Sequence, residues 1–491
     1  MTRSSISPFC LASCFVVVSA LLTGVCGGAG RPNILFVFTD DQAPWAVGVA
    51  GHPMAKTPHM DELFNSGAYL PNSFTVTPVC SPSRASLMTS RYGTEVGITD
   101  WIRPYQQWNP ETELGGTEWG LDPALPVWPR LLREAGYDTA LIGKWHLGQP
   151  DFYHPRKHGF SLFIGHRHGG WLTVDPVMEK DGKDRGFSGL TADILADEVI
   201  HFLEKERKKP FLCAWHTRAP HTAWLPVSEE DAAPYVDMTD AETPVPHPDY
   251  PNLDTPRVKR MMREYFSSVR SVDRNLGRVL TSLKELGLEE NTIVIFSSDH
   301  GYNMGHNGIW HKGNGHWVTK PLPGVTNPNV PKGQRPNMYD TSIKVPTAVR
   351  WPGVIEPGTV IEETMTNLDW FPTICAMAGI ALPEDATIRG RDLTPILRGE
   401  AVADWDNTYY GEYSTLHQSQ THMRCWRTAE YKLVRDFLNP ERDEFYDLAK
   451  DPGETTNLIG TEDAGLQAVI EKYDALIRAK MEEVGDAVGN L

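Results

Sequence analysis

The sequence predicts an α/β fold in which a mostly parallel β-sheet is covered by helices, followed by a smaller α+β subdomain. Three observations predict it: short β-rich runs alternate with long helical segments, those segments carry regularly spaced apolar residues, and the pattern changes after Arg398. At 491 residues the chain has room for one large domain and a small appendage. Its 40% apolar and 22% charged residues are typical of a globular protein.

Four short runs rich in β-branched and aromatic residues are the expected strands of the sheet. They are residues 33–38, 139–142, 211–215 and 292–296. Long segments with helical periodicity separate them, and strands joined by helices pair in parallel. Cys213 lies in one of these runs and Cys375 in an apolar helical run, so both are expected to be small buried core residues.

Two segments show the spacing of an amphipathic helix. Between residues 258 and 286, apolar side chains recur at intervals of three, four or seven: Met262, Phe266, Val269, Leu276, Leu280 and Leu283. A second, shorter stripe consists of Leu195, Val199 and Phe202. One apolar face per helix predicts packing against the sheet rather than contact with a cofactor.

The C-terminal part of the chain has a different pattern. Short strands are expected at residues 409–413 and 431–435, followed by a turn at Asp451-Pro452-Gly453. A final helix carries one apolar face made of Leu466, Ile470, Tyr473, Ile477 and Met481. We therefore expect a main, catalytic domain over residues 31–398 and a C-terminal subdomain over residues 399–491.

Two Pro/Gly-rich stretches, residues 220–256 and 313–336, are too long to be simple connections. Loops of this length in a compact domain are usually functional. We expect them to form walls of the substrate site.

The first 30 residues have the features of a signal peptide. Arg3 precedes an apolar stretch over residues 9–25, and small residues follow at 27–30. This stretch is shorter than the roughly 20 residues of a membrane-spanning helix, which argues against an anchor. Val25 is bulkier than the small residue expected before a lipidated Cys26. We expect an exported protein, periplasmic or secreted, with no membrane span after cleavage.

The net charge of −17 argues against a nucleic-acid-binding surface, because such binding depends on clustered Lys and Arg. It is compatible with a small anionic substrate. Charges more than about 10 Å apart are largely screened, so a local basic pocket can attract an anion.

Two pairs of polar residues directly follow expected strands. Asp40-Asp41 follows the run at 33–38, and Asp299-His300 follows the run at 292–296. The carboxyl ends of parallel strands share one edge of the sheet, where such folds place their sites. Three carboxylates meeting there need a cation between them, and oxygen ligands favour Ca²⁺ or Mg²⁺. Each Asp alone is better explained as a turn residue or a helix cap.

The run Cys80-Ser81-Pro82-Ser83-Arg84 resembles the Cys-x-Pro-Ser-Arg signature of the type I sulfatases. Residues 136–148, Gly-Tyr-Asp-Thr-Ala-Leu-Ile-Gly-Lys-Trp-His-Leu-Gly, resemble the second signature of that family, and residues 443–458 resemble its C-terminal segment. The resemblance covers most of residues 31–399. It implies an alkaline-phosphatase-like fold and a modifying enzyme that converts Cys80 to formylglycine.

The resemblance also implies a role for each site residue. Formylglycine at position 80 would bind Ca²⁺, or alternatively Mg²⁺, together with Asp40, Asp41, Asp299 and His300. One hydroxyl of the hydrated aldehyde attacks sulfur, and the other later expels sulfate. The catalytic roles are stabilisation of the nucleophile by Arg84, neutralisation of sulfate oxygens by Lys144 and Lys312, removal of the second hydroxyl proton by His146, and protonation of the leaving alcohol by His221.

Some assignments have alternatives. Lys320 is the alternative to Lys312, because the residues around Lys312 match the family pattern loosely, and Asn is common in the family where this chain has His300. Four further histidines near the motifs receive no role: His216, His306, His311 and His316.

The implied reaction is hydrolysis of a sulfate monoester, carried by a small molecule or a glycan, to an alcohol and inorganic sulfate. One alternative is a phosphonate or phosphate ester hydrolase of the same superfamily that also uses formylglycine. The other is a non-catalytic binder of sulfated glycans in which Cys80 remains a thiol.

Overall fold

The computed structural model describes residues 1, 30–104, 120–324 and 327–490. Residues 2–29, which make up nearly all of the predicted signal peptide, lie outside the described part. Within these ranges, no helix combines the length and apolar character needed to cross a membrane.

The centre of the described structure is a ten-stranded sheet. Five neighbouring strands are parallel, in the order β9-β1-β8-β4-β5. Their bounds are Thr292–Ser298 (β9), Asn33–Thr39 (β1), Phe211–His216 (β8), Asp138–Lys144 (β4) and Leu162–His166 (β5). The outer strands are β15 (Thr359–Val360), β2 (Ala68–Tyr69), β14 (Ala348–Arg350), β6 (Val177–Lys180) and β7 (Lys183–Gly186). All four predicted strands are present in this parallel centre.

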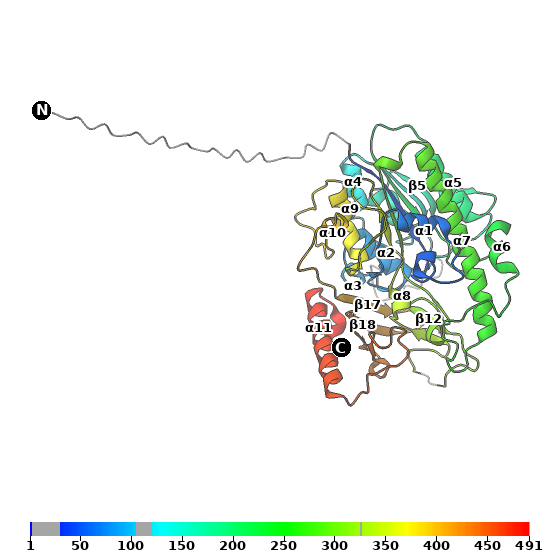
Figure 1. Cartoon of the computed structure of the whole chain (residues 1–491), viewed down its shortest axis with the longest axis vertical. Coiled ribbons are helices and arrows are strands. Elements are labelled where there is room, and N and C mark those ends of the chain that lie inside the picture. The colour runs from blue at the N-terminus through cyan, green and yellow to red at the C-terminus, as the bar shows by residue number, and fades with distance from the viewer. Residues whose placement is uncertain (2–29, 105–119, 325–326, 491) are drawn as a thin grey trace. The chain divides into compact units, whose positions relative to one another are not determined.

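Helices cover both faces of the sheet. Alternate residues of a strand point to opposite faces, and the apolar side chains on each face are buried against helices. Phe36 of β1 lies in the core with α2 (Cys80–Thr89), α4 (Trp128–Glu134), α9 (Trp370–Met377) and α10 (Thr394–Leu397). Val37 lies in the core with α1 (Pro58–Asn65), α5 (Thr191–Leu203), α6 (Glu229–Val236) and α7 (Thr255–Glu285). Figure 1 shows the long α7 beside α5, on the other side of the sheet from α9 and α10. The α/β fold class is confirmed.

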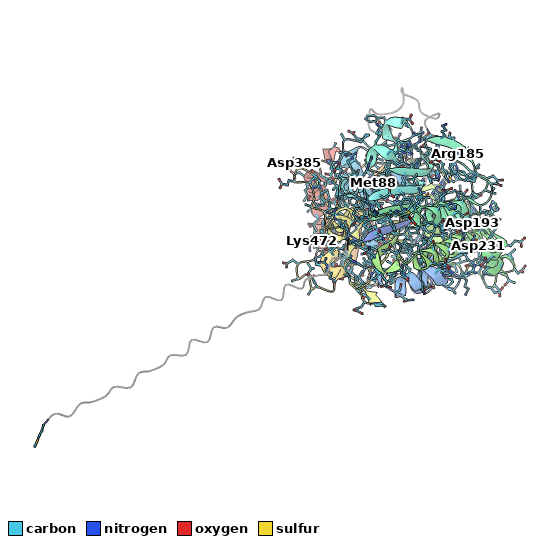
Figure 2. All side chains as sticks on the ribbon, turned by 90° about the horizontal axis from the view of Figure 1, so that it is seen from above. Met88, Arg185, Asp193, Asp231, Asp385 and Lys472 are labelled. Atoms are coloured by element: carbon cyan, nitrogen blue, oxygen red, sulfur yellow. The ribbon has the colours of Figure 1, made fainter. Side chains whose placement is uncertain are left out.

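The expected burial of core side chains also holds. Met88 of α2 lies in the interior, whereas Lys472 of the C-terminal helix α11 (Ala464–Glu483) and Asp385 lie at the surface (Figure 2). Cys213 and Cys375 are fully buried free cysteines, as predicted.

The C-terminal segment forms a four-stranded antiparallel sheet and a helix. The elements are β17 (Tyr409–Thr415), β18 (Thr421–Arg427), β19 (Tyr431–Asp436), β20 (Glu444–Asp447) and α11 (Ala464–Glu483). Tyr410 faces α11, whereas Tyr409 and Tyr413 pack with Phe74 and Val79 of the main domain. The subdomain therefore contacts the chain directly before Cys80. The predicted boundary at residue 398 stays a prediction.

Two smaller sheets and short helices complete the described structure. The sheets are β10 (Asn303–Met304), β11 (Ile309–His311), β12 (Asn314–Trp317) and β13 (Gln334–Pro336), and β3 (Ser73–Phe74) with β16 (Met365–Thr366). The remaining α-helices are α3 (Gly93–Val96) and α8 (Asp340–Ile343). The 3₁₀ helices are Gly48–Ala50, Asp151–Tyr153, Pro155–His158, Glu289–Asn291, His306–Gly308, Asn367–Asp369, Pro440–Arg442 and Ala487–Asn490. The stretch 313–336, predicted as a loop, is thus partly two strands.

Candidate active site

Adjacent parallel strands of the main sheet end at one edge, and the predicted polar pairs lie there. Asp40 and Asp41 directly follow β1, and Asp299 and His300 directly follow β9. Lys144 is the last residue of β4. The shared direction of the strands therefore brings together residues that are up to 260 positions apart in sequence.

Two overlapping groups of side chains have ligand atoms close enough to hold one cation. In each group these atoms lie within 4.8 Å of one another: Asp40, Cys80, Asp299 and His300, and separately Asp40, Asp41, Cys80 and His221. The three carboxylates are completely buried, and Oδ2 of Asp41 has no hydrogen-bond partner in the described structure. A buried carboxylate oxygen without a partner is costly, and the three carboxylates suit a hard divalent cation. The residues present fit a metal.

Cys80 is the first residue of helix α2, and its side chain is 3% exposed. Nζ of Lys312 lies 2.9 Å from Sγ, and Nε2 of His300 lies 3.5 Å from it. Burial raises the pKa of the Cys80 thiol, but Lys144 and Lys312 outweigh burial and lower the pKa to about 5. The helix N-terminus also favours negative charge. Position 80 is therefore built to stabilise an anionic side chain.

The residues after Cys80 form hydrogen bonds to the surrounding elements. Nε and Nη2 of Arg84 donate to Oδ2 of Asp299 at 3.1 and 3.0 Å. The Ser83 hydroxyl donates to the Asp299 carbonyl, and the Ser81 hydroxyl donates to the His146 carbonyl at 3.0 Å. The polar residues of the motif thus fix the metal-side carboxylate and the segment that carries His146.

Two buried lysines neutralise the first carboxylate pair. Lys144 donates to Oδ2 of Asp40, and Lys312 donates to Oδ1 of Asp41 at 2.6 Å. Burial raises the pKa of Asp40, but the Lys144 ammonium helps to hold that pKa well below its usual range. Lys320, the alternative to Lys312, is exposed.

His146 follows β4 and has a left-handed backbone, with φ at 55°. Its Nε2 lies 3.0 Å from the carbonyl oxygen of Ile102, which can only accept, so Nε2 carries the proton of the neutral ring. Nδ1 is buried and has no partner among the described residues. Burial holds the pKa of His146 well below its usual value. The neutral ring therefore offers Nδ1 as a base.

His221 lies in the turn that follows β8. Its Nδ1 donates to the carbonyl of Thr222 at 2.6 Å, which leaves Nε2 as the atom that faces the site, 3.9 Å from Oδ2 of Asp41. Burial lowers the pKa of His221 to about 4, although Asp41 acts in the opposite direction.

A pocket of about 380 Å³ opens beside Cys80. It is lined by Val79, Cys80, Trp101, Ile102, Pro104, His146, His168, Gly169, Gly170, Trp171, His221, His311, Lys312 and Asn314. Each of the two long stretches predicted as walls contributes, the first through His221 and the second through Asn314.

Sequence reasoning assigned no role to four aromatic residues that line this pocket: Trp101, Trp171, His168 and His311. The pair Gly169-Gly170 before Trp171 was a usable signal, because glycine pairs mark close backbone approaches. A Cβ at Gly169 would lie 2.4 Å from Cε1 of His146. Of the histidines without a predicted role, His311 lines the pocket and His216 lies behind it, with Nδ1 3.4 Å from Nη1 of Arg84.

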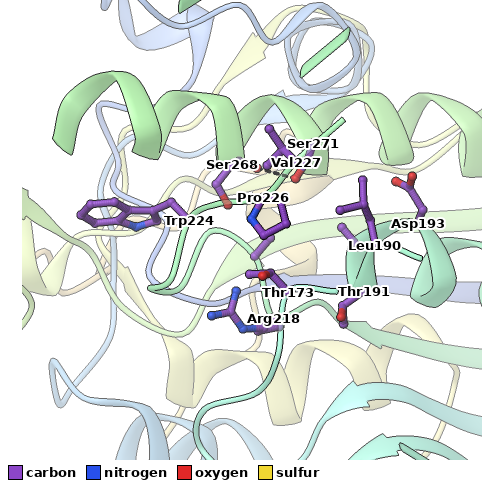
Figure 3. A pocket seen from close by; sticks show the side chains of 12 residues that line it. Thr173, Leu190, Thr191, Asp193, Arg218, Trp224, Pro226, Val227, Ser268 and Ser271 are labelled. Atoms are coloured by element: carbon purple, nitrogen blue, oxygen red, sulfur yellow. Dashed lines mark hydrogen bonds between the residues drawn. The ribbon is translucent and has the colours of Figure 1, made fainter. Parts of the chain in front are cut away.

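Arg218 forms hydrogen bonds to two segments that line the pocket. Its Nε donates to the Trp171 carbonyl at 2.7 Å, and its Nη1 donates to the Ala223 carbonyl, beyond His221, at 3.0 Å. Arg218 also lines a separate cavity between Trp224 and Asp193 (Figure 3). That cavity measures about 20 Å³, which is room for one water molecule rather than a substrate.

Comparison with known proteins agrees with the fold. The sulfatase family profile matches residues 32–380, and the profile of the C-terminal part of N-sulphoglucosamine sulphohydrolase matches residues 334–483. The chain is 28% identical to N-acetylglucosamine-6-O-sulfatase of Bacteroides thetaiotaomicron, over 88% of this chain and 83% of that protein. It is also 28% identical to an ulvan-active sulfatase of Formosa agariphila, over 93% and 82%.

Solved structures support the same fold. One protein, solved in complex with its substrate D-glucosamine-2-N,6-O-disulfate, superposes with a TM-score of 0.76 at 25% identity, over 93% of this chain and 99% of that one. The phosphonate monoester hydrolase of Agrobacterium radiobacter shares the fold, with a TM-score of 0.69 at 21% identity, over 92% and 96%. The predicted alkaline-phosphatase-like fold is confirmed, and the profile match covers most of the chain. The chain belongs to the sulfatase family and is a hydrolase of sulfate esters.

Proposed function

We propose that this sulfatase removes sulfate from a sulfated carbohydrate, using formylglycine formed from Cys80 and a bound Ca²⁺. The observation that carries the proposal is that ligand atoms of Asp40, Cys80, Asp299 and His300 lie within 4.8 Å of one another. Cys80 is the first residue of the buried helix α2.

The metal site would consist of Asp40, Asp41, Asp299, His300 and residue 80, with Mg²⁺ as the alternative ion. A cation held there would supply positive charge that acidifies the nucleophile and attracts the sulfate group, and the hydrated aldehyde at residue 80 would supply the nucleophilic hydroxyl. Buried oxygen ligands and the unpartnered Oδ2 of Asp41 support this assignment. A formylglycine-generating enzyme is the partner that the modification requires.

The remaining residues bind the sulfate group and move protons. Lys144 and Lys312 are placed to offset the charge of its oxygens, and Arg84 orients the Asp299 carboxylate. Nδ1 of His146 is free to accept a proton. Nε2 of His221 faces the pocket side of the site and would donate to the leaving alcohol. The negative charge of a bound sulfate ester favours the protonated form of that ring.

The pocket supports a carbohydrate as the leaving group. Two indoles and several imidazoles among its lining residues suit the mixed apolar and polar faces of a sugar ring. Related proteins are named for N-acetylglucosamine 6-sulfate and for ulvan. The sequence features of the first 30 residues support export to the periplasm or the medium.

The test is a turnover comparison across substrate classes. We expect release of inorganic sulfate from a sulfated mono- or disaccharide, and faster turnover of an aryl sulfate than of the matching aryl phosphate or phosphonate. Preference for the phosphonate would assign the chain to the alternative reaction. Binding of sulfated glycans without turnover by an aldehyde-containing sample would favour the binding-protein alternative.

The general-acid role of His221 predicts an effect that depends on the leaving group. Nitrophenolate departs with little help, whereas a sugar alkoxide needs a proton, so His221→Ala should slow a sugar sulfate by about 10²–10⁴-fold and nitrophenyl sulfate much less. Lys144→Ala should slow both substrates alike, because it acts on the sulfate group they share. Equal losses on both substrates for His221→Ala would move the role to another pocket histidine such as His311.

A further inference from the structure

His146 is held by a short segment of the main domain. Its ring Nε2 donates to the Ile102 carbonyl at 3.0 Å. The Ile102 N–H donates to Oγ of Ser81 at 2.9 Å, and that hydroxyl donates to the His146 carbonyl at 3.0 Å. Both the ring and the backbone of His146 therefore depend on where Ile102 lies.

The C-terminal subdomain in turn holds this segment. Oδ1 of Asp100 accepts the N–H of Trp101, and Oδ2 accepts the N–H of Leu416, each at 2.8 Å. Nε2 of His417 lies 2.9 Å from the Trp101 carbonyl, to which it donates. The rings of Trp101 and His417 also meet edge to face, with centroids 4.9 Å apart. Leu416 and His417 belong to the turn between β17 and β18.

The carboxylate of Asp100 is buried, with 7% of the residue exposed. Burial raises the pKa of Asp100 to about 7, while the N–H groups of Leu416, Trp101 and His417, and the charge of Arg103, act in the opposite direction. These N–H groups therefore stabilise the ionised carboxylate of Asp100, and that carboxylate in turn fixes the positions of Trp101 and Leu416. An amide at this position would offer only one acceptor oxygen, so Asp100→Asn must break one of the two bonds.

We propose that Asp100 and the Leu416–His417 turn are positioning residues: the C-terminal subdomain fixes Ile102 and thereby the orientation of the proton-accepting ring of His146. This inference rests on the proposed function. Gly169 packs against the Cε1–Nε2 edge of the ring, where a Cβ would clash, and Nδ1 has no hydrogen-bond partner among the described residues. The bond to Ile102 is therefore the hydrogen bond that orients the ring in the described structure. Small misplacements of a catalytic group cost about 10²-fold in rate.

The kinetic test uses Asp100→Asn and His417→Ala. The alcohol leaves before the sulfate, and His146 serves sulfate release. Both variants should therefore lower kcat at least about tenfold and lower KM in parallel, with kcat/KM close to that of the wild type. Stopped-flow measurement with nitrophenyl sulfate should show a burst of nitrophenolate larger than that of the wild type. His417→Gln keeps an N–H donor near the position of Nε2 and should restore most of kcat.

A structural readout accompanies the kinetics. Hydrogen exchange at the amides of Trp101 and Ile102 should be faster in Asp100→Asn and His417→Ala, and close to the wild type in His417→Gln. The matched control is Glu412→Gln. Glu412 is a buried carboxylate of the subdomain that accepts the N–H of Thr94 at 2.7 Å, and in the described structure it makes no hydrogen bond to Ile102. Glu412→Gln should lower stability and leave the burst at its wild-type size.

The outcomes separate this inference from the proposed function. If the amides of Trp101 and Ile102 exchange faster in the variants while kcat and the size of the burst stay at wild-type values, the positioning role is wrong. Equal kinetic losses in Glu412→Gln and Asp100→Asn would also overturn it. If Asp100→Asn does not fold, the His417→Ala and His417→Gln pair decides alone, because only one hydrogen bond differs between them. Absence of sulfate-ester turnover in the aldehyde-containing wild type would instead overturn the proposed function.

Discussion

Cys80→Ala should lose sulfate-ester turnover by on the order of 10⁴-fold or more while remaining folded. The side chain at this position lies at the N-terminus of α2 between Lys312 and the metal-side carboxylates, and the proposed nucleophile is made from it. Alanine leaves no group that can be oxidised to an aldehyde. Steady-state kinetics on an aryl sulfate, with circular dichroism to verify folding, measure the effect.

The matched control is Cys213→Ala. Cys213 is also a fully buried free cysteine, but it lies within β8, where burial raises its pKa to about 12. Its replacement should cost some stability and leave turnover near that of the wild type. Substantial activity in Cys80→Ala would contradict the proposed chemistry, whereas equal losses in both variants would indicate a folding defect.

Asp41→Asn should weaken Ca²⁺ binding at least tenfold, which is about 1.4 kcal/mol, and lower turnover with it. Oδ2 of Asp41 is the buried carboxylate oxygen that no described group satisfies, so it is the oxygen most available to a cation. The substitution removes one negative charge from the ligand set. Isothermal titration of metal-stripped protein with Ca²⁺ measures the affinity without reference to activity.

Asp231→Asn is the control for this effect. Asp231 is equally buried, but its oxygens accept from Nε and Nη2 of Arg274, away from the site. Its loss should reduce thermal stability and leave the Ca²⁺ affinity unchanged. Full activity of chelator-treated wild type would contradict the metal requirement, and chelation that lowers thermal stability and turnover together would agree with it.

The central fold could be predicted because its signals are local. Residues 34–38 are all apolar, as expected for a strand buried on both faces, and β1 is buried along its length. The apolar positions from Met262 to Leu283 likewise predicted α7, because they recur at helical spacing.

The C-terminal sheet was predicted only in part, because buried charges hide its strands. Arg424 of β18 is fully buried and pairs with Asp486, and Glu444 of β20 is buried and pairs with Arg335. A pattern that assigns charged residues to the surface cannot detect such strands, since the partners lie on other elements. β18 and β20 were missed for this reason.

The metal-side residues could be proposed from sequence because each follows a predicted strand or lies in a motif. The pocket walls could not, because Trp101 and Trp171 lie in loops whose positions depend on contacts distant in sequence, such as Leu416 with Asp100 and Arg218 with the Trp171 carbonyl. Only the folded chain shows which loop faces Cys80.

The most direct test of the central claim is the relation between aldehyde content at residue 80 and activity. Mass spectrometry of the peptide that contains residue 80 gives the fraction converted, in preparations made with different amounts of the modifying enzyme. Specific activity toward a sulfate monoester should rise in proportion to that fraction and extrapolate to zero at zero conversion. Full activity in a preparation that contains only unmodified Cys80 would contradict the account.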